Sequence, residues 1–233
     1  MTQPGHLYGI GVGPGDPELM TLKAVRLLDR VAVVAYLGPE GGDSSARAIA
    51  AEFIPAGRTE IAIAMPMRPG REPVEIYDKA AGEIAAHLED GRDVAVLCEG
   101  DPFFYGSFMY LHDRLGGRFP CTIVPGIASI TACAAAAAVP LVRRDATLTV
   151  LPATLDDPSL EARLANADAA AIMKVGRHLA RIRALLERLG RIEGAFYVER
   201  ATRPDQRVRP LAQLAAPDAP YFSMILLPER SKS

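Results

Sequence analysis

The chain has 233 residues, which is enough for one large domain or for two small ones. Hydrophobic residues make up 49% and charged residues 23%, the balance of an ordinary soluble globular protein, and the net charge of −2 argues against non-specific nucleic-acid binding. Its 3 cysteines are widely spaced and form no C-x-x-C pair, so we expect a reduced, cytoplasmic protein without structural disulfides. Its 4 histidines are scattered along the chain and support no metal site. The longest weakly polar run, residues 130–142, is shorter than a bilayer span of about 20 residues, so we expect no membrane segment.

Apolar, β-branched runs alternate with helical patterns through the first half of the chain. The apolar runs predict strands over residues 7–12, 31–36, 61–64, 94–98 and 122–124. The helical patterns predict helices over residues 17–28, 44–53, 73–88 and 107–115. This alternation predicts a parallel sheet with helices on both faces, and such sheets bind ligands beyond the carboxyl ends of their strands.

The second half of the chain has a different rhythm. An alanine-rich helix is expected from Ala128 to just before Pro140. After it we predict strands over residues 148–151, 170–174, 195–199 and 222–227, helices over 160–165 and 177–189, and a turn or hairpin over 203–210. Helix content falls towards the end, so we expect a second, more mixed sheet.

The most informative segment is LYGIGVGPGDPELMTLK, residues 7–23, a glycine-rich turn between a predicted strand and a predicted helix. Asp16 suits the N-cap, Pro17 the first helical position and Glu18 the positive helix end. So many glycines around Pro14 favour a loop that contacts a ligand over a plain connection. The dinucleotide fingerprint G-x-G-x-x-G is absent, because its last position falls on Pro14 or Asp16, and no phosphate P-loop is present. The turn therefore disfavours an anionic cofactor and permits a zwitterionic or cationic one.

Two further loops follow predicted strands. In EGDPFFYG, residues 99–106, Asp101 offers a carboxylate, while Phe103, Phe104 and Tyr105 offer flat apolar walls. The alternative is a simple strand-to-helix turn whose aromatic side chains enter the core. VPGIAS, residues 124–129, is a third strand–turn–helix junction. Three such loops at the ends of neighbouring strands predict one shared crevice.

Taken together, GVGPGDPELMTLKA, EGDPFFYG and VPGIAS resemble, in order and spacing, the tetrapyrrole methylases, which transfer a methyl group from S-adenosylmethionine to a macrocycle. MKVG at residues 173–176 and YVERAT at 197–202 extend the resemblance over nearly the whole chain. Within the family, VVAYLGPEGGDSSARAIA at 33–50, MPM at 65–67 and YFSMILLPER at 221–230 are most similar to the branch that methylates C20 of precorrin-2. Glu99 at the start of the second loop, where the sirohaem-forming members typically carry glycine, also favours this cobalamin branch.

The resemblance implies an α/β protein of two domains with a cleft between them. Residues 1–124 would form the N-terminal α/β domain with a mostly parallel sheet, and residues 125–233 a C-terminal α/β domain with a mixed sheet. It also implies a homodimer that binds S-adenosylmethionine in the cleft. The implied contacts with this cofactor are Pro14, Gly100, Asp101, Phe104, Ala128, Ser129, Met173 and Ala201. A sulfonium is cationic, so Asp101 or Glu99 can face it; Met173 alone would equally suit a strand core.

The implied substrate, a precorrin, carries acetate and propionate carboxylates, so its site needs arginine or lysine donors. Arg143, Arg144 and Lys174 are the candidates, and Arg200 and Arg203 add to the pool. The arginines of the predicted 177–189 helix lie opposite a leucine stripe and are typical of a solvated helix face. In the reaction, C20 attacks the methyl group and loses a proton. No catalytic base is assigned, and the candidates that stay open are Asp101, Tyr105, Glu199 and Tyr221.

Three alternatives remain at this point. The acceptor could be another precorrin or uroporphyrinogen III. A nucleotide-dependent oxidoreductase of doubly wound fold is a different class, against which the missing G-x-G-x-x-G counts. A non-catalytic tetrapyrrole-binding module is the third, and it would leave the three loops without a purpose.

Overall fold

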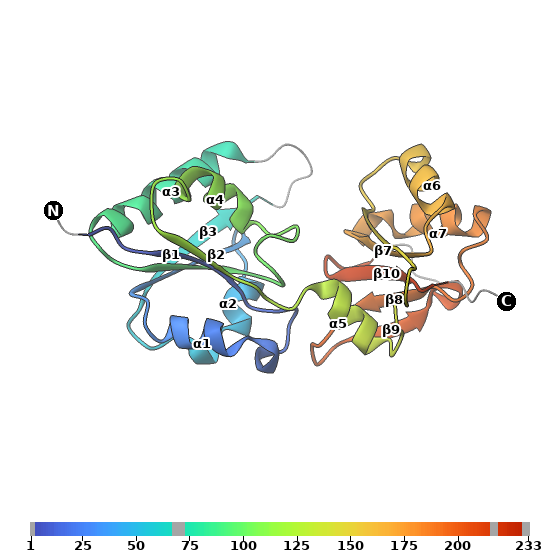
Figure 1. Cartoon of the computed structure of the whole chain (residues 1–233), viewed down its shortest axis with the longest axis horizontal. Coiled ribbons are helices and arrows are strands. Elements are labelled where there is room, and N and C mark those ends of the chain that lie inside the picture. The colour runs from blue at the N-terminus through green and yellow to red at the C-terminus, as the bar shows by residue number, and fades with distance from the viewer. Residues whose placement is uncertain (1–2, 67–72, 215–218, 230–233) are drawn as a thin grey trace. The chain divides into compact units, whose positions relative to one another are not determined.

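The computed structural model describes residues 3–66, 73–214 and 219–229. It divides into two compact units, Met1–Ala128 and Ser129–Ser233, which we call the N-unit and the C-unit. Each unit contains a five-stranded sheet with helices on both faces (Figure 1). The division follows Ala128, whereas the sequence analysis put the domain boundary after residue 124. Residue 67 of the MPM stretch and residue 230 of the last stretch lie outside the described residues.

The N-unit sheet is parallel throughout, as predicted. It consists of β1 (Leu7–Gly11), β2 (Val33–Pro39), β3 (Thr59–Met65), β4 (Val94–Cys98) and β5 (Cys121–Val124), in the order β3-β2-β4-β1-β5. The register pairs Gly11 with Cys98 and Ile10 with Val124. The carboxyl ends of β1, β4 and β5 therefore meet at one edge of the sheet, and the three loops singled out in the sequence all start there.

Alternating strand residues bury the two faces of this sheet under two pairs of helices (Figure 1). α3 (Val74–Glu89) and α4 (Phe108–Leu115) cover one face, while α1 (Leu22–Leu28) and α2 (Ser45–Ile49) cover the other. Because adjacent strand residues point to opposite faces, Val94 and Val96 pack under the first pair, and Ala95 and Leu97 under the second. A strand that is buried on both faces has apolar residues at every position, as the sequence VAVLC of β4 does.

The single helix predicted over residues 17–28 is wrong. Asp16 does cap a helical turn, accepting a hydrogen bond from the Glu18 N–H at 2.9 Å, but this turn is a 3-10 helix confined to Pro17–Leu19. Thr21 is extended and accepts from the Ala24 N–H at 3.2 Å, which starts α1 as a separate helix. Threonine is a good N-cap, and its own cap competes with helix continuation. The 44–53 helix divides in the same way into α2 and a 3-10 turn at Ala51–Phe53.

The C-unit sheet is mixed, as predicted. Its strands are β6 (Leu148–Pro152), β7 (Ala169–Met173), β8 (Phe196–Glu199), β9 (Arg207–Pro210) and β10 (Ser223–Leu227), in the order β6-β7-β10-β8-β9. β6 and β7 are parallel, whereas β10 runs antiparallel to both β7 and β8. β8 and β9 are antiparallel neighbours, so the turn or hairpin predicted over residues 203–210 is a hairpin.

Helices also cover both faces of the C-unit sheet (Figure 1). α6 (Asp157–Ala165) and α7 (Leu179–Arg188), preceded by a 3-10 turn at Gly176–His178, pack on one face; a further 3-10 turn, Leu211–Gln213, follows β9. α5 (Ser129–Ala136) packs on the other face through Ile130, Ala132 and Cys133. It ends earlier than the alanine-rich pattern predicted. Within the described residues, no helix has both the length and the apolar character needed to cross a bilayer.

Candidate functional site

The first two glycine loops of the N-unit are joined directly by backbone hydrogen bonds. Beyond the end of β1, the N–H of Gly13 donates to the carbonyl of Gly100 at 3.3 Å, and the N–H of Gly100 donates back to the carbonyl of Gly13 at 2.7 Å. Both glycines have positive φ, 79° and 65°, a conformation that other residues rarely adopt. These two hydrogen bonds form a rigid junction between the loops. Pro14 lies next to it in the first loop, and Asp101 lies next to it in the second.

The third loop comes equally close to this junction. A Cβ on Gly126 would lie 2.0 Å from the carbonyl oxygen of Gly100, and a Cβ on Gly11 would lie 2.6 Å from the same oxygen. Both contacts are far shorter than van der Waals distance, so only glycine fits at either position. The sequence predicts glycines that let a ligand approach the backbone, whereas at Gly11 and Gly126 the glycines let one loop approach another.

Asp101 holds the second and third loops together. One carboxylate oxygen accepts from the N–H of Phe103 at 2.9 Å, and the other accepts from the N–H of Gly126 at 3.1 Å. The first bond closes a turn within its own loop, and the second crosses to the third loop. The carboxylate therefore organises the backbone of the site, a role that the sequence analysis did not foresee.

The aromatic residues of the second loop face outward. Phe103, Phe104 and Tyr105 are 46%, 36% and 43% exposed, so the alternative in which they enter the core is wrong. Tyr105 has a φ of 56°, an unusual value for a bulky side chain, and its ring meets that of Phe104 edge-on with centroids 5.3 Å apart. Exposed flat rings beside a rigid backbone junction offer apolar surface against which a flat ligand can pack.

The N-unit therefore brings together the predicted cofactor contacts on its three loops. Pro14, Gly100, Asp101 and Phe104 lie on two loops that share backbone hydrogen bonds, and Ala128 ends the third loop. The remaining predicted contacts belong to the C-unit. Ser129 is the first residue of α5 there.

In the C-unit, Met173, Lys174 and Ala201 share one end of the sheet. Met173 is the last residue of β7, and Ala201 follows β8 by two residues. β10 starts between these strands, since Met224 pairs with Met173 and Ser223 pairs with Glu199. We call this end, where β7 and β8 finish and β10 begins, the β7/β8 edge. Strands two places apart are about 10 Å apart, so these residues flank the start of β10 closely.

The predicted substrate cations do not form one cluster. The backbone N–H of Arg143 donates to the Glu229 carboxylate at 3.1 Å, and Glu229 lies just beyond the end of β10. Because β10 is antiparallel to β7, Arg143 and its neighbour Arg144 lie at the opposite end of the sheet from Lys174. A five-residue strand such as β7 spans roughly 16 Å. The sequence analysis grouped the three residues by charge, and the strand directions separate them.

Glu199, one of the open candidates for a catalytic base, is 8% exposed and already engaged. Its carboxylate accepts a hydrogen bond from the Tyr197 hydroxyl at 2.6 Å, and the Arg207 Nε lies 3.6 Å away. Burial, and next the bond to Glu199, raise the pKa of Tyr197 well above its usual value. This pair faces the α7 side of the sheet, among the core residues of that side. Its contacts are those of a structural pair.

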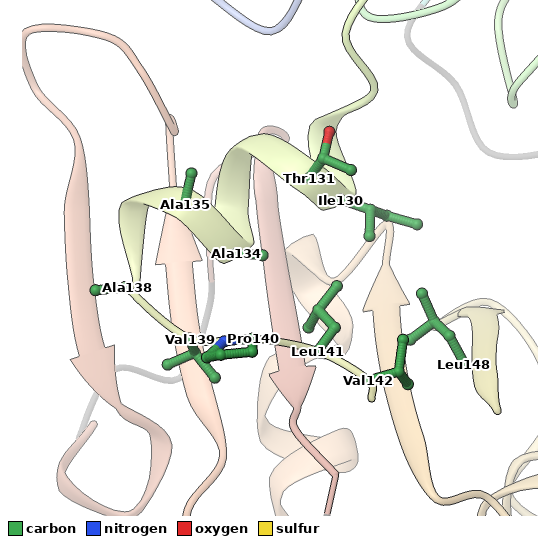
Figure 2. Close-up of a pocket in the computed structure, with 10 residues that line it drawn as sticks. All are labelled: Ile130, Thr131, Ala134, Ala135, Ala138, Val139, Pro140, Leu141, Val142 and Leu148. Atoms are coloured by element: carbon green, nitrogen blue, oxygen red, sulfur yellow. The ribbon is translucent and has the colours of Figure 1, made fainter. Parts of the chain in front are cut away.

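A separate apolar groove of about 590 Å³ lies between α5, the segment that follows this helix, and β6 (Figure 2). It is lined by Ile130, Thr131, Ala134, Ala135, Ala138, Val139, Pro140, Leu141, Val142 and Leu148. Thr131 is the one polar side chain in this lining. Small-molecule sites combine apolar walls with several polar groups that fix orientation, and this groove lacks them. None of its ten lining residues is a predicted site residue.

Residues 6–215 match the family described as Tetrapyrrole (Corrin/Porphyrin) Methylases. The chain belongs to this family. The resemblance carried by the three loops is thereby confirmed, and the oxidoreductase alternative is wrong.

Curated relatives of this methylase include enzymes of the expected branch. Over 96% of the chain and 95% of the relative, it is 43% identical to a protein of Sinorhizobium sp named precorrin-2 C(20)-methyltransferase. It is 32% identical to the cobalt-precorrin-2 C(20)-methyltransferase of Salmonella typhimurium, over 96% of each chain. It is 45% identical to the cobalamin biosynthesis protein CobIJ of Mycobacterium tuberculosis, of which it spans about half, 47%.

Solved structures give the same fold. A cobalt precorrin-4 methyltransferase, CbiF, has a TM-score of 0.75 at 24% identity, covering 95% of this chain and 93% of that one. The uroporphyrin-III C-methyl transferase of Thermus thermophilus, solved in complex with S-adenyl homocysteine, has a TM-score of 0.70 at 26% identity, covering 95% of this chain and 97% of that one.

Proposed function

We propose that this methylase transfers the methyl group of S-adenosylmethionine to the C20 meso carbon of precorrin-2, or of its cobalt form, in cobalamin biosynthesis. The observation that carries the proposal is the 43% identity, over nearly the full length of both chains, to a protein named for this reaction. The neighbouring structure solved with S-adenyl homocysteine supports the choice of donor. We further propose that the protein works in the cytoplasm, without a resident metal and without nucleic-acid or membrane partners, and that it forms the homodimer that the family resemblance implies.

The N-unit loops fit the chemistry of the donor. S-adenosylmethionine combines a flat apolar adenine with a zwitterionic, sulfonium-bearing chain. The exposed ring of Phe104 and the Asp101 carboxylate belong to the same loop. The rigid junction of Gly13 and Gly100 fixes the backbone on both sides of this surface. We assign Pro14, Gly100, Asp101, Phe104 and Ala128 to donor binding from the N-unit. Ser129, Met173 and Ala201 are the corresponding assignments in the C-unit.

The donor supplies a methyl group that its positive sulfur has already activated for attack. What the protein adds is alignment of the acceptor carbon with that methyl group. Holding two reactants in the correct geometry is worth roughly 7–11 kcal/mol of barrier. Ordered backbone at the N-unit junction serves this purpose, because a misplacement of about 1 Å is costly to the rate. The buried pairing of Glu199 with Tyr197 disfavours it as the group that removes the C20 proton.

The substrate site should be cationic, because precorrins carry carboxylates around the ring. We propose Arg143, Arg144 and Lys174 as substrate-binding residues. Since the two arginines and the lysine lie at opposite ends of the C-unit sheet, they cannot hold a single carboxylate together. Each end can be tested by itself.

The decisive experiment is turnover of the purified protein with precorrin-2 and a methyl donor labelled in its methyl group. We expect one labelled methyl group in the product by mass spectrometry, placed at C20 by NMR. Parallel reactions with cobalt-precorrin-2 and with uroporphyrinogen III compare the alternative acceptors. A product methylated at another carbon, or turnover of uroporphyrinogen III alone, would overturn the C20 assignment while leaving methyl transfer intact. Binding of the donor without methylation of any of these acceptors would overturn both.

A further inference from the structure

The turn that follows β8 is strained in an unusual way. Arg200 and Thr202, on either side of Ala201, have positive φ values of 49° and 70°. Neither is glycine, and L residues with side chains pay a steric penalty in this region. A strained backbone conformation persists only where surrounding contacts hold it in place, and such conformations are concentrated at functional sites.

Several contacts hold the turn in this shape. The N–H of Thr202 donates to the side-chain oxygen of Gln206 at 2.7 Å, and the N–H of Arg203 donates to the carbonyl of Arg200 at 3.0 Å. The guanidinium of Arg200 bonds Asp205 at 2.6 Å. The turn is also tied to the sheet, because the N–H of Arg200 donates to the carbonyl of Phe222 at 2.8 Å. Arg203 follows Thr202 in this turn, so the same contacts fix the position of its backbone.

Arg203 differs from Arg200 and Arg207, two other arginines of this hairpin, which both lie near carboxylates. Arg200 is paired with Asp205, and Arg207 lies 3.6 Å from Glu199. The guanidinium of Arg203 lies instead over the ring of Phe222, with its central carbon 4.3 Å from the ring centroid. Its Nη2 is buried and meets no hydrogen-bond acceptor in the part of the chain that the structure describes.

Buried donors without an acceptor are rare, and each one calls for an explanation. The structure describes two other arginines with such an atom, and both have another partner: Arg58 donates to the carbonyl of Asp29, and Arg183 to that of Leu214. For Arg203, the ring of Phe222 supports one side of the guanidinium, and the N–H donors lie in the guanidinium's own plane. These donors match a carboxylate, which accepts two parallel bonds from them.

We propose that Arg203 binds a carboxylate of the tetrapyrrole substrate and sets the orientation of the macrocycle at the β7/β8 edge. Phe222 is the platform that fixes the guanidinium. Lys174 directly follows the last residue of β7, the neighbour of β10 on its other side, so a second cation lies at the same edge. The inference rests on the proposed function for the identity of the acceptor. Among the additional arginines that the sequence offers for substrate binding, it selects Arg203 and names the contact that this residue makes.

The test compares Arg203→Lys, Arg203→Ala and Phe222→Leu with Arg209→Ala, a matched control on the exposed strand β9. Arg203→Lys keeps the charge but loses the planar fork, so we expect KM for precorrin-2 to rise about tenfold with kcat little changed. Phe222→Leu should raise KM less, and Arg209→Ala should leave it unchanged. Affinity for S-adenosylmethionine, measured by calorimetry, should be the same in all four variants.

Binding of uroporphyrin, a carboxylate-rich macrocycle followed by its own fluorescence, separates failure of the inference from failure of the proposed function. If precorrin-2 is not methylated but Arg203→Lys still weakens uroporphyrin binding about tenfold, the carboxylate contact stands and the reaction assignment fails. If the wild type methylates precorrin-2 and both Arg203 variants keep its KM while their melting temperature falls, Arg203 is structural and the inference is overturned. Should Arg203→Ala fail to fold, Arg203→Lys and Phe222→Leu decide the question.

Discussion

The carboxylate of Asp101 accepts a hydrogen bond from the backbone N–H of Gly126, 25 residues further along the chain, at 3.1 Å. Its other oxygen accepts from the N–H of Phe103 at 2.9 Å. One acidic side chain thus fixes its own loop and fastens it to the next one. Because Gly100 is bonded in the same region to Gly13, the three N-unit loops form one connected backbone unit.

Removing the Asp101 carboxylate should loosen this unit. Asp101→Ala leaves two backbone N–H groups without their acceptor, and hydrogen bonds to a charged group contribute about 1.5–3 kcal/mol. We expect the free energy of unfolding of the N-unit to fall by about 2 kcal/mol or more, measured by chemical denaturation. Asp101→Asn keeps one oxygen acceptor and should lose about half as much.

The same variants decide whether Asp101 also touches the donor. If its role is to position the loops, the loss of S-adenosylmethionine affinity should follow the loss of stability across Asp101→Asn and Asp101→Ala. A variant of unchanged stability that no longer binds the donor would instead identify Asp101 as a direct contact with the cationic ligand.

Gly126→Ala should be among the most damaging single substitutions in the N-unit. The added Cβ would lie 2.0 Å from the Gly100 carbonyl oxygen and 2.9 Å from the Gly11 Cα, and both are backbone atoms that cannot rotate away. We expect a loss of about 3 kcal/mol together with weakened donor binding.

Gly82→Ala is the matched control. Gly82 lies in α3, and a Cβ there meets nothing within 4 Å. Alanine should stabilise this helix by about 0.5–1 kcal/mol. Thermal unfolding of the two variants would contradict the packing argument if both moved in the same direction.

The sequence was sufficient to predict the layers and the position of the three loops. The apolar runs overlap β1–β5, and VAVLC coincides with β4, which is apolar at consecutive positions because it is covered on both faces. Loops after such strands share one edge of a parallel sheet, so glycine-rich sequence there predicts convergence without any knowledge of distances. The parallel N-unit sheet and the mixed C-unit sheet followed from the same patterns.

What the sequence did not reveal depends on contacts between distant residues. Whether Asp101 faces a ligand or another loop is decided by Gly126, and no local pattern links the two. Arg143 and Lys174 look alike as cations near a strand, but the antiparallel insertion of β10 places them at opposite ends of the sheet. The break at Thr21 had a local signal, since threonine is a good N-cap, and it was outweighed by the apolar periodicity that continues on both sides.

Stability of the C-unit should fall at high pH, in part through Cys133. Burial in the cluster under α5 raises the pKa of this thiol from 9.0 to about 12. Between these values the unfolded chain has lost the proton and the folded chain has kept it, so a rise in pH favours unfolding. Denaturation at about pH 8 and about pH 10.5 should show this loss, and Cys133→Ala should reduce its size.

Cys121→Ala, at a half-buried position of the N-unit, is the comparison. Equal pH dependence in wild type and Cys133→Ala would show that other groups, such as Tyr197, account for the whole effect.

Phe104→Ala should separate binding from stability in the second loop. The ring is 36% exposed and packs edge-on against the exposed ring of Tyr105, so its removal opens no large cavity in the core. We expect less than about 1 kcal/mol of destabilisation, the range of surface substitutions, but a loss of S-adenosylmethionine affinity of about tenfold or more, because a flat apolar wall of the proposed site is gone. Leu22→Ala removes a 72% exposed apolar side chain from the start of α1, outside the second loop, and should leave donor affinity unchanged. Calorimetric titration of both variants with the donor measures the difference. Equal affinities in Phe104→Ala and the wild type would mean that the exposed aromatic loop serves another purpose, and that the donor is held by the remaining residues of the assignment.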